Sequence, residues 1–80
     1  MRLDKFLKVS RVIKRRPVAN EACDNGRVSI NGKVAKASTD VKIGDIVEIK
    51  FGEKIVKFEV MGLSEIATKE NAENLVQFLN

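Results

Sequence analysis

The first sixteen residues, MRLDKFLKVSRVIKRR, separate apolar from basic side chains at a helical period, and this pattern constrains the fold most. At about 100° per residue, one arc collects Leu3, Phe6, Leu7, Ser10 and Ile13. The opposite arc collects Asp4 and the cations Arg2, Lys5, Lys8 and Arg11. The pattern predicts a helix whose apolar side packs into a core. Its basic side is either an ordinary solvated surface or a binding face, and the helix alone does not decide between them.

Charge is distributed unevenly along the 80 residues. The first sixteen carry seven basic side chains and one acidic one, a net charge of +6, whereas the remainder carries eight and ten, a net charge of −2. This asymmetry indicates a polyanionic partner, nucleic acid or an anionic membrane, that approaches one face of the molecule. A membrane-surface helix would carry a larger apolar face, so nucleic acid is favoured.

A second helix is predicted over roughly 17–25. Pro17 suits a first helical turn, and Asn25-Gly26 provides a left-handed exit. Cys23 falls on the apolar side of this helix, and we expect it to pack between the two helices as a small hydrophobe. Arg16 lies near the start of the helix, where a cation opposes the helix dipole, and this indicates an external anion nearby.

The apolar pattern then changes to that of strands. Asn31-Gly32 is the strongest short hairpin signal, with Val28 and Ile30 on one strand and Val34 on the other. Whether Asn31 also contacts a ligand stays open. Val41 is expected to begin a short strand.

Two longer strands are predicted at about 46–51 and 54–61, separated by a Gly-Glu turn. The C-terminal segment is predicted as an amphipathic helix with Thr68 as its N-cap. Its apolar residues, at helical spacing, are Ala72, Leu75, Val76 and Leu79. The order is two helices, four strands and a helix, an α+β fold in a single domain over 1–80.

Several function classes lack the residues that they need. The chain has no histidine and one cysteine, so we expect no metal site, no cofactor and no catalytic triad, and we expect the protein not to be an enzyme. No apolar run is long enough to span a membrane. The four phenylalanines, all expected in the core, are Phe6, Phe51, Phe58 and Phe78. Without exposed aromatics, recognition of folded RNA by shape is favoured over stacking of single-stranded bases.

The motifs RLDKFL at 2–7, NGRVSINGKVAK at 25–36 and VKIGD at 41–45, with a basic corner between them, resemble the RNA-binding domain named after ribosomal small-subunit protein four. The resemblance implies an αL motif over 1–50, in which two helices and a hairpin grip structured RNA, with an additional strand and the C-terminal helix over 51–80. By position it implies core residues at Leu3, Leu7, Val28 and Ile30. The RNA-facing candidates that match by position are Arg2, Lys5, Lys8, Arg15, Arg16, Arg27 and Lys33. Arg11 on the basic arc and Lys36 beside the hairpin complete the candidate RNA-binding set.

The whole chain also resembles stand-alone bacterial members of that family that act in ribosome quality control. This resemblance implies a cytoplasmic, ribosome-associated protein that binds rRNA and the P-site peptidyl-tRNA on obstructed large subunits. It implies a partner, RqcH, on the same particle and template-free alanine tailing as the process supported. We expect a monomer off the ribosome. The alternative is a general rRNA-binding or ribosome-assembly factor of the same fold.

Overall fold

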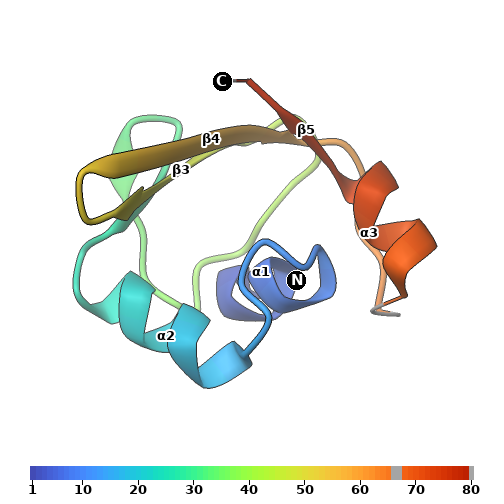
Figure 1. Ribbon diagram of the computed structural model, residues 1–80. Helices are drawn as coiled ribbons and strands as arrows, with labels where there is room; N and C mark the ends of the chain where they lie inside the picture. Colours follow the sequence, from blue (N-terminus) through green and yellow to red (C-terminus); the bar gives the residue numbers. More distant parts are fainter. Residues whose placement is uncertain (66–67, 80) are drawn as a thin grey trace.

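The computed structural model describes residues 1–65 and 68–79 and has three helices and a five-stranded antiparallel sheet (Figure 1). The elements are α1 (Leu3–Val9), α2 (Arg16–Asp24), β1 (Val28–Ile30), β2 (Lys33–Val34), β3 (Ile46–Phe51), β4 (Lys54–Val60), α3 (Lys69–Leu75) and β5 (Val76–Phe78). The sheet order is β2-β1-β3-β4-β5. This is the expected α+β class.

One face of the sheet is apolar because the registers align hydrophobic residues across the strands. Ile30 lies opposite Val47, Val47 opposite Phe58, and Phe58 opposite Phe78. Helices α1 and α2 both lie on the same side of the sheet (Figure 1). The ring of Phe6 from α1 stacks on Phe58, with centroids 6.2 Å apart. The core therefore fills the layer between this sheet face and the two N-terminal helices.

The helix pair packs as the sequence predicted. Leu3, Phe6 and Leu7 of α1 are fully buried, and Cys23 of α2 is 2% exposed. Burial is the main reason that the pKa of the Cys23 thiol rises to about 11, and the nearby carboxylates of Asp4 and Asp24 add to it. A thiol with so high a pKa is a poor nucleophile at neutral pH. The burial of Cys23 in the hydrophobic core confirms the prediction that it packs as a small hydrophobe.

The first helix is shorter than the basic and apolar arcs predicted. It ends at Val9, and Arg11 has φ +60°, the left-handed conformation in which helices usually place glycine. The Arg11 N–H donates to the Lys8 carbonyl at 2.9 Å, and the Ile13 N–H donates to that of Leu7 at 3.1 Å, which closes the helix end. Arg11 therefore leaves the basic arc of α1, although Ile13 remains buried.

The hairpin forms at Asn31-Gly32 as predicted, with both residues at positive φ, 52° and 85°. The side chain of Asn31 bonds within the protein. Its Oδ1 accepts from the Ile46 N–H at 3.0 Å, and its Nδ2 donates to Asp45 Oδ1 at 3.1 Å. Asn31 thus joins the hairpin to the start of β3. Val34, the residue predicted for the second strand, is exposed.

The C-terminal prediction is half right. Thr68 is the N-cap of α3 and its hydroxyl accepts from the Asn71 N–H at 3.1 Å. The helix ends at Leu75, however, and Val76 begins β5, where it pairs with Val60. The prediction that Val76 and Leu79 are helical was wrong, because pairing of 76–78 with the free edge of β4 outweighs the local helical spacing.

Two further expectations were wrong. Val41 is buried but does not begin a strand, since the extended segment there makes only an isolated bridge between Arg2 and Asp40. Phe51 and Phe78 are not core residues, because they are 41% and 56% exposed. Both lie on the apolar side of the sheet, and each is the last residue of its strand. The structure therefore has two exposed aromatic rings where the sequence predicted none.

Candidate nucleic-acid interface

A buried carboxylate gathers two arginines at the N-terminal ends of α1 and α2. Asp4 is 2% exposed. Its Oδ1 accepts from Arg2 Nε at 3.2 Å, and its Oδ2 lies 3.4 Å from Arg16 Nε. Asn20 Nδ2 donates to Oδ2 at 3.2 Å. We call these four residues, Arg2, Asp4, Arg16 and Asn20, the arginine corner.

The backbone positions the arginine corner by joining three segments. Arg2 is the N-cap of α1, and Asp4 lies in its first turn. Arg16 is the first residue of α2, and Asn20 follows one turn later. The N–H groups of Leu3 and Asp4 donate to the carbonyls of Thr39 and Ala37, at 2.8 and 3.2 Å, so the segment after the hairpin is tied to the same place.

The hydrogen bonds keep Asp4 ionised in spite of its burial. Desolvation is the largest single effect and raises the pKa of the carboxyl, but the bonds from Asn20, Arg2, the Lys5 N–H and Arg16 together outweigh it. The net result is a pKa below the ordinary value of 3.8. At neutral pH the corner thus holds two cations around one anion.

Both guanidinium groups keep an outward surface. The side chain of Arg2 is 52% exposed and that of Arg16 is 44% exposed, whereas that of Asp4 is 3% exposed. An arginine whose Nε is held by a carboxylate still has N–H groups that can donate to a phosphate in a fixed direction. The sequence indicated an external anion near Arg16, whereas the anion that the structure places there is the Asp4 carboxylate of the protein itself.

The remaining candidates on the helix pair are not equivalent. Lys8 and Arg15 are exposed. Lys5 forms an ion pair with Glu65, and this bond lowers the pKa of the Glu65 carboxyl. Any phosphate contact of Lys5 must compete with that partner.

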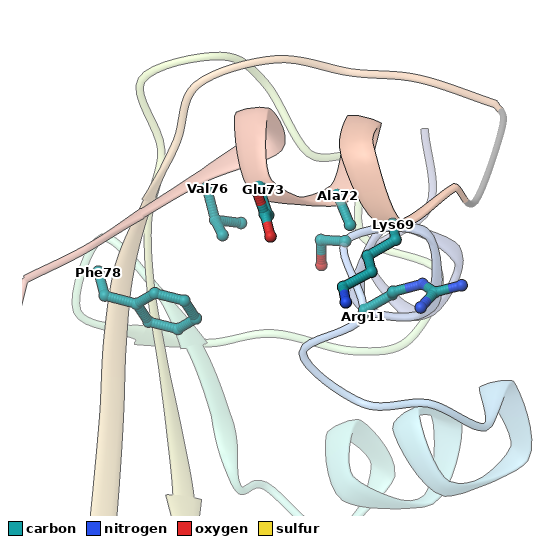
Figure 2. A pocket seen from close by; sticks show the side chains of 7 residues that line it. Arg11, Lys69, Ala72, Glu73, Val76 and Phe78 are labelled. Carbon is teal, nitrogen blue, oxygen red and sulfur yellow. The ribbon is translucent and has the colours of Figure 1, made fainter.

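The other candidates lie away from the arginine corner. Arg27 is exposed, and its carbonyl accepts from the Lys50 N–H at 2.9 Å, beside the ring of Phe51. Lys33 and Lys36 are exposed, and Lys36 directly precedes the segment that binds the start of α1. Arg11 lines a separate groove with α3 and β5 (Figure 2).

The sequence reasoning missed the two residues that organise the site. It placed Asp4 on the outer basic arc, and it gave Asn20 no role. Asp4 does lie in α1, but Arg2, Arg16 and Asn20 close over the carboxylate and remove it from solvent. A single acid among seven cations, in the first turn of a helix, was the available signal.

Residues 1–65 and 68–79 hold neither a metal-binding cluster nor a helix that could span a membrane. No group of three or more cysteines and carboxylates there is placed to hold a metal ion. No helix in this part of the chain has the length and apolar character needed to cross a membrane.

A known domain family covers the helix pair, the hairpin and the first residues of β3. Residues 1–47 match the S4 domain family model. Because the match covers more than half of the chain, the chain belongs to the S4 domain family, as its motifs predicted.

Similar proteins of known name show to which group within the S4 domain family the chain belongs. The chain is 56% identical over 79 residues to the RQC P-site tRNA stabilizing factor of Bacillus subtilis, covering 99% of this chain and 92% of that protein. It is 49% identical over 80 residues to the protein of the same name from Streptococcus pneumoniae, covering 100% and 91%. The fold also matches the trimeric structure of Vibrio cholerae heat shock protein 15, with a TM-score of 0.90 and 29% identity over 99% of this chain and 81% of that one. The chain belongs to the family of RQC P-site tRNA stabilizing factors.

Proposed function

We propose that this protein is a non-catalytic RNA-binding factor of ribosome-associated quality control that binds rRNA and the P-site peptidyl-tRNA on obstructed large ribosomal subunits. The observation that carries the proposal is the identity of 56% with the Bacillus subtilis factor along nearly the full length of both chains. The arginine corner supplies a chemical basis, because it presents two fixed guanidinium groups to a polyanion. In this proposal the protein works in the cytoplasm beside RqcH and supports template-free alanine tailing.

We assign graded roles to the candidate residues. Arg2 and Arg16 form the centre of the RNA surface because Asp4 fixes their direction. The exposed cations around them add phosphate contacts of lower specificity: Lys8, Arg15, Arg27, Lys33 and Lys36. Lys5 contributes when RNA displaces Glu65.

Single neutral substitutions test the surface. Reversal of charge at Arg2 or Arg16 would place a second acid beside buried Asp4, so glutamine is the better replacement. Arg16→Gln should weaken co-sedimentation with large subunits and reduce the slope of log affinity against log salt by roughly 0.7–0.9, the value for one phosphate contact. Lys54→Gln, which removes one exposed charge at the start of β4, is the matched control and should change neither quantity.

Melting curves of each variant show whether it is folded. A folded Arg16→Gln variant that binds subunits with the wild-type affinity and salt slope would refute the assignment of the arginine corner.

The kind of ribosomal particle to which the protein binds distinguishes a role in quality control from the alternative, a general rRNA-binding or assembly factor. A tagged copy should purify with large subunits that carry peptidyl-tRNA, and loss of RqcH should abolish alanine tails on the nascent chains. Recovery of immature subunits without tRNA would favour assembly instead. We also propose a monomer off the ribosome, and sedimentation equilibrium tests this against the trimer described for the Vibrio cholerae relative.

A further inference from the structure

A second surface feature lies outside the arginine corner, between α3, β5 and the loop after α1. It is a groove of about 400 Å³, within the range of roughly 300–1,000 Å³ typical of small-ligand sites. Ala72 and Val76 supply apolar lining, and Phe78 supplies an aromatic ring. Figure 2 shows the ring of Phe78 at one end of the groove and the side chains of Arg11 and Lys69 at the other.

The ring of Phe78 is both anchored and accessible. It packs edge-on against the buried ring of Phe58, with centroids 6.1 Å apart and an angle of 69° between the planes. The residue nevertheless remains 56% exposed. A ring held in this way is a rigid platform on which a planar group can stack with little loss of side-chain freedom.

Two cations converge on the far end of the groove from separate elements. Lys69 is the first residue of α3, and Arg11 follows the end of α1. Within residues 1–65 and 68–79, neither forms an ion pair. Arg11 is held there in a left-handed backbone conformation, which glycine would adopt with less strain. The carboxylate of Glu73 lies between these cations and the ring, and Ser10 completes the lining.

We propose that this groove binds one unstacked nucleotide of RNA. The base stacks on Phe78, the phosphate is bound by Arg11 and Lys69, and Glu73 accepts a hydrogen bond from an exocyclic amine or a ribose hydroxyl. An aromatic platform paired with cations is the usual composition of single-strand RNA sites. An acidic peptide would also satisfy the cations, but Glu73 would repel it and it would leave the aromatic platform without a planar partner.

This proposal rests on the proposed RNA-binding function and extends it beyond the S4 domain match. That match ends at residue 47, whereas α3 and β5 supply most of the groove. The arginine corner would then hold folded RNA through its phosphates, while the groove would hold a single nucleotide that has left its helix.

Nuclear magnetic resonance of the ¹⁵N-labelled protein can separate the two surfaces. A single-stranded hexanucleotide should shift the amide signals of Arg11, Ala72, Glu73, Val76 and Phe78. A blunt RNA duplex should shift those of the arginine corner and leave the groove unchanged. Shifts confined to the corner with both RNAs would overturn the proposal, as would tighter occupation of the groove by an acidic peptide of equal length.

Substitutions distinguish stacking from simple apolar contact. Phe78→Leu should weaken binding of the hexanucleotide about 5- to 150-fold, the range for loss of one base–aromatic stack, and Phe78→Tyr should bind as the wild type does. Gln77→Ala is the control, because Gln77 lies opposite Glu59 on the other face of β5. Equal affinities for Phe78→Leu and the wild type would exclude the site.

Arg11→Gly tests the groove with a variant whose loss of affinity cannot be attributed to unfolding. Glycine suits the left-handed backbone at this position, so the melting temperature should not fall, whereas the affinity for the hexanucleotide should. Retained affinity in this variant would also contradict the proposal. If duplex binding is lost in Arg16→Gln but not in Phe78→Leu, the corner and the groove are independent. If no RNA of either kind binds, the proposed function fails before the groove is in question.

Discussion

The arginine corner and the groove beside Phe78 each bring two cations together, but by different means. In the corner, Arg2 and Arg16 are both held on the buried carboxylate of Asp4. In the groove, Arg11 and Lys69 come from separate elements, and no acid within the described ranges pairs with either. The corner is thus fixed before RNA arrives, whereas the cations of the groove are free to adjust to it.

This difference indicates what each surface can recognise. Guanidinium groups in a fixed direction select the spacing of phosphates, which is how a protein reads the shape of a folded RNA. Flexible cations next to a rigid ring suit a nucleotide whose position varies, because stacking tolerates every base. The two surfaces also depend on different parts of the fold. The arginine corner depends on the buried carboxylate of Asp4, whereas the groove depends on α3, a helix of seven residues.

The largest effect is expected from Asp4→Asn. The amide keeps the shape of the side chain but removes the anion on which two arginines and Asn20 converge. We expect a loss of about 1.5–3 kcal/mol in the free energy of unfolding, the range for hydrogen bonds to a charged group, and no more than that because both arginines are about half exposed. Urea unfolding followed by circular dichroism measures it.

The control for this variant removes the same charge from the same helix pair. Asp24, at the end of α2, is exposed, and Asp24→Asn should change the free energy of unfolding by less than about 0.5 kcal/mol. Equal stability of the two variants would show that Asp4 does not organise the corner.

Acid should weaken the corner in the same direction, because protonation also removes the charge of Asp4. The folded protein holds the pKa of Asp4 below 3.8, because its hydrogen bonds outweigh the opposing effect of burial, whereas the unfolded chain has the ordinary value. The stabilisation is therefore complete above about pH 4 and is lost as the pH falls through the lowered pKa.

Urea midpoints between pH 6 and pH 2 test this expectation when the wild type is compared with Asp4→Asn. The stability difference between them should narrow as the pH falls below 3.8. The comparison cancels the contributions of Asp40 and Glu65, whose pKa values are also lowered and which are present in both proteins. A difference that does not change with pH would contradict the assignment to Asp4.

Most of the scaffold could be predicted from the sequence, because its signals are local. The Asn31-Gly32 turn, the second helix with its Asn25-Gly26 exit, and the cap at Thr68 each depend on a few neighbouring residues. The family resemblance added the RNA-facing role of the helix pair. These signals placed the two arginines of the corner among the candidates.

The features that could not be predicted from the sequence depend on contacts between distant segments of the chain. Helical spacing at the C-terminus does not reveal that the edge of β4 is free to pair with Val76–Phe78. A helical projection of the first sixteen residues assumes that the helix continues, so it could not show that Arg11 turns away toward α3. The burial of Asp4 likewise requires Arg16 and Asn20 from the next helix.

The smallest loss of folding free energy is expected from a substitution beside the groove, at Thr68. Thr68 is the N-cap of α3, whereas α1 and α2 have no side-chain hydrogen bond at that position. Thr68→Ala removes the bond from the Asn71 N–H and should cost about 1 kcal/mol, with the loss concentrated in a helix of only seven residues. Amide hydrogen exchange should accelerate in α3 and remain unchanged at the helix pair.

The matched variant is Thr68→Ser, which keeps the hydroxyl and should exchange as the wild type does. If the groove is a separate nucleotide site, Thr68→Ala should also weaken binding of the single-stranded hexanucleotide, because α3 carries Lys69 and Glu73, while leaving duplex binding by the corner intact. Equal weakening of both RNAs would show that the two surfaces act as one, and the distinction between a fixed corner and an adaptable groove would have to be abandoned.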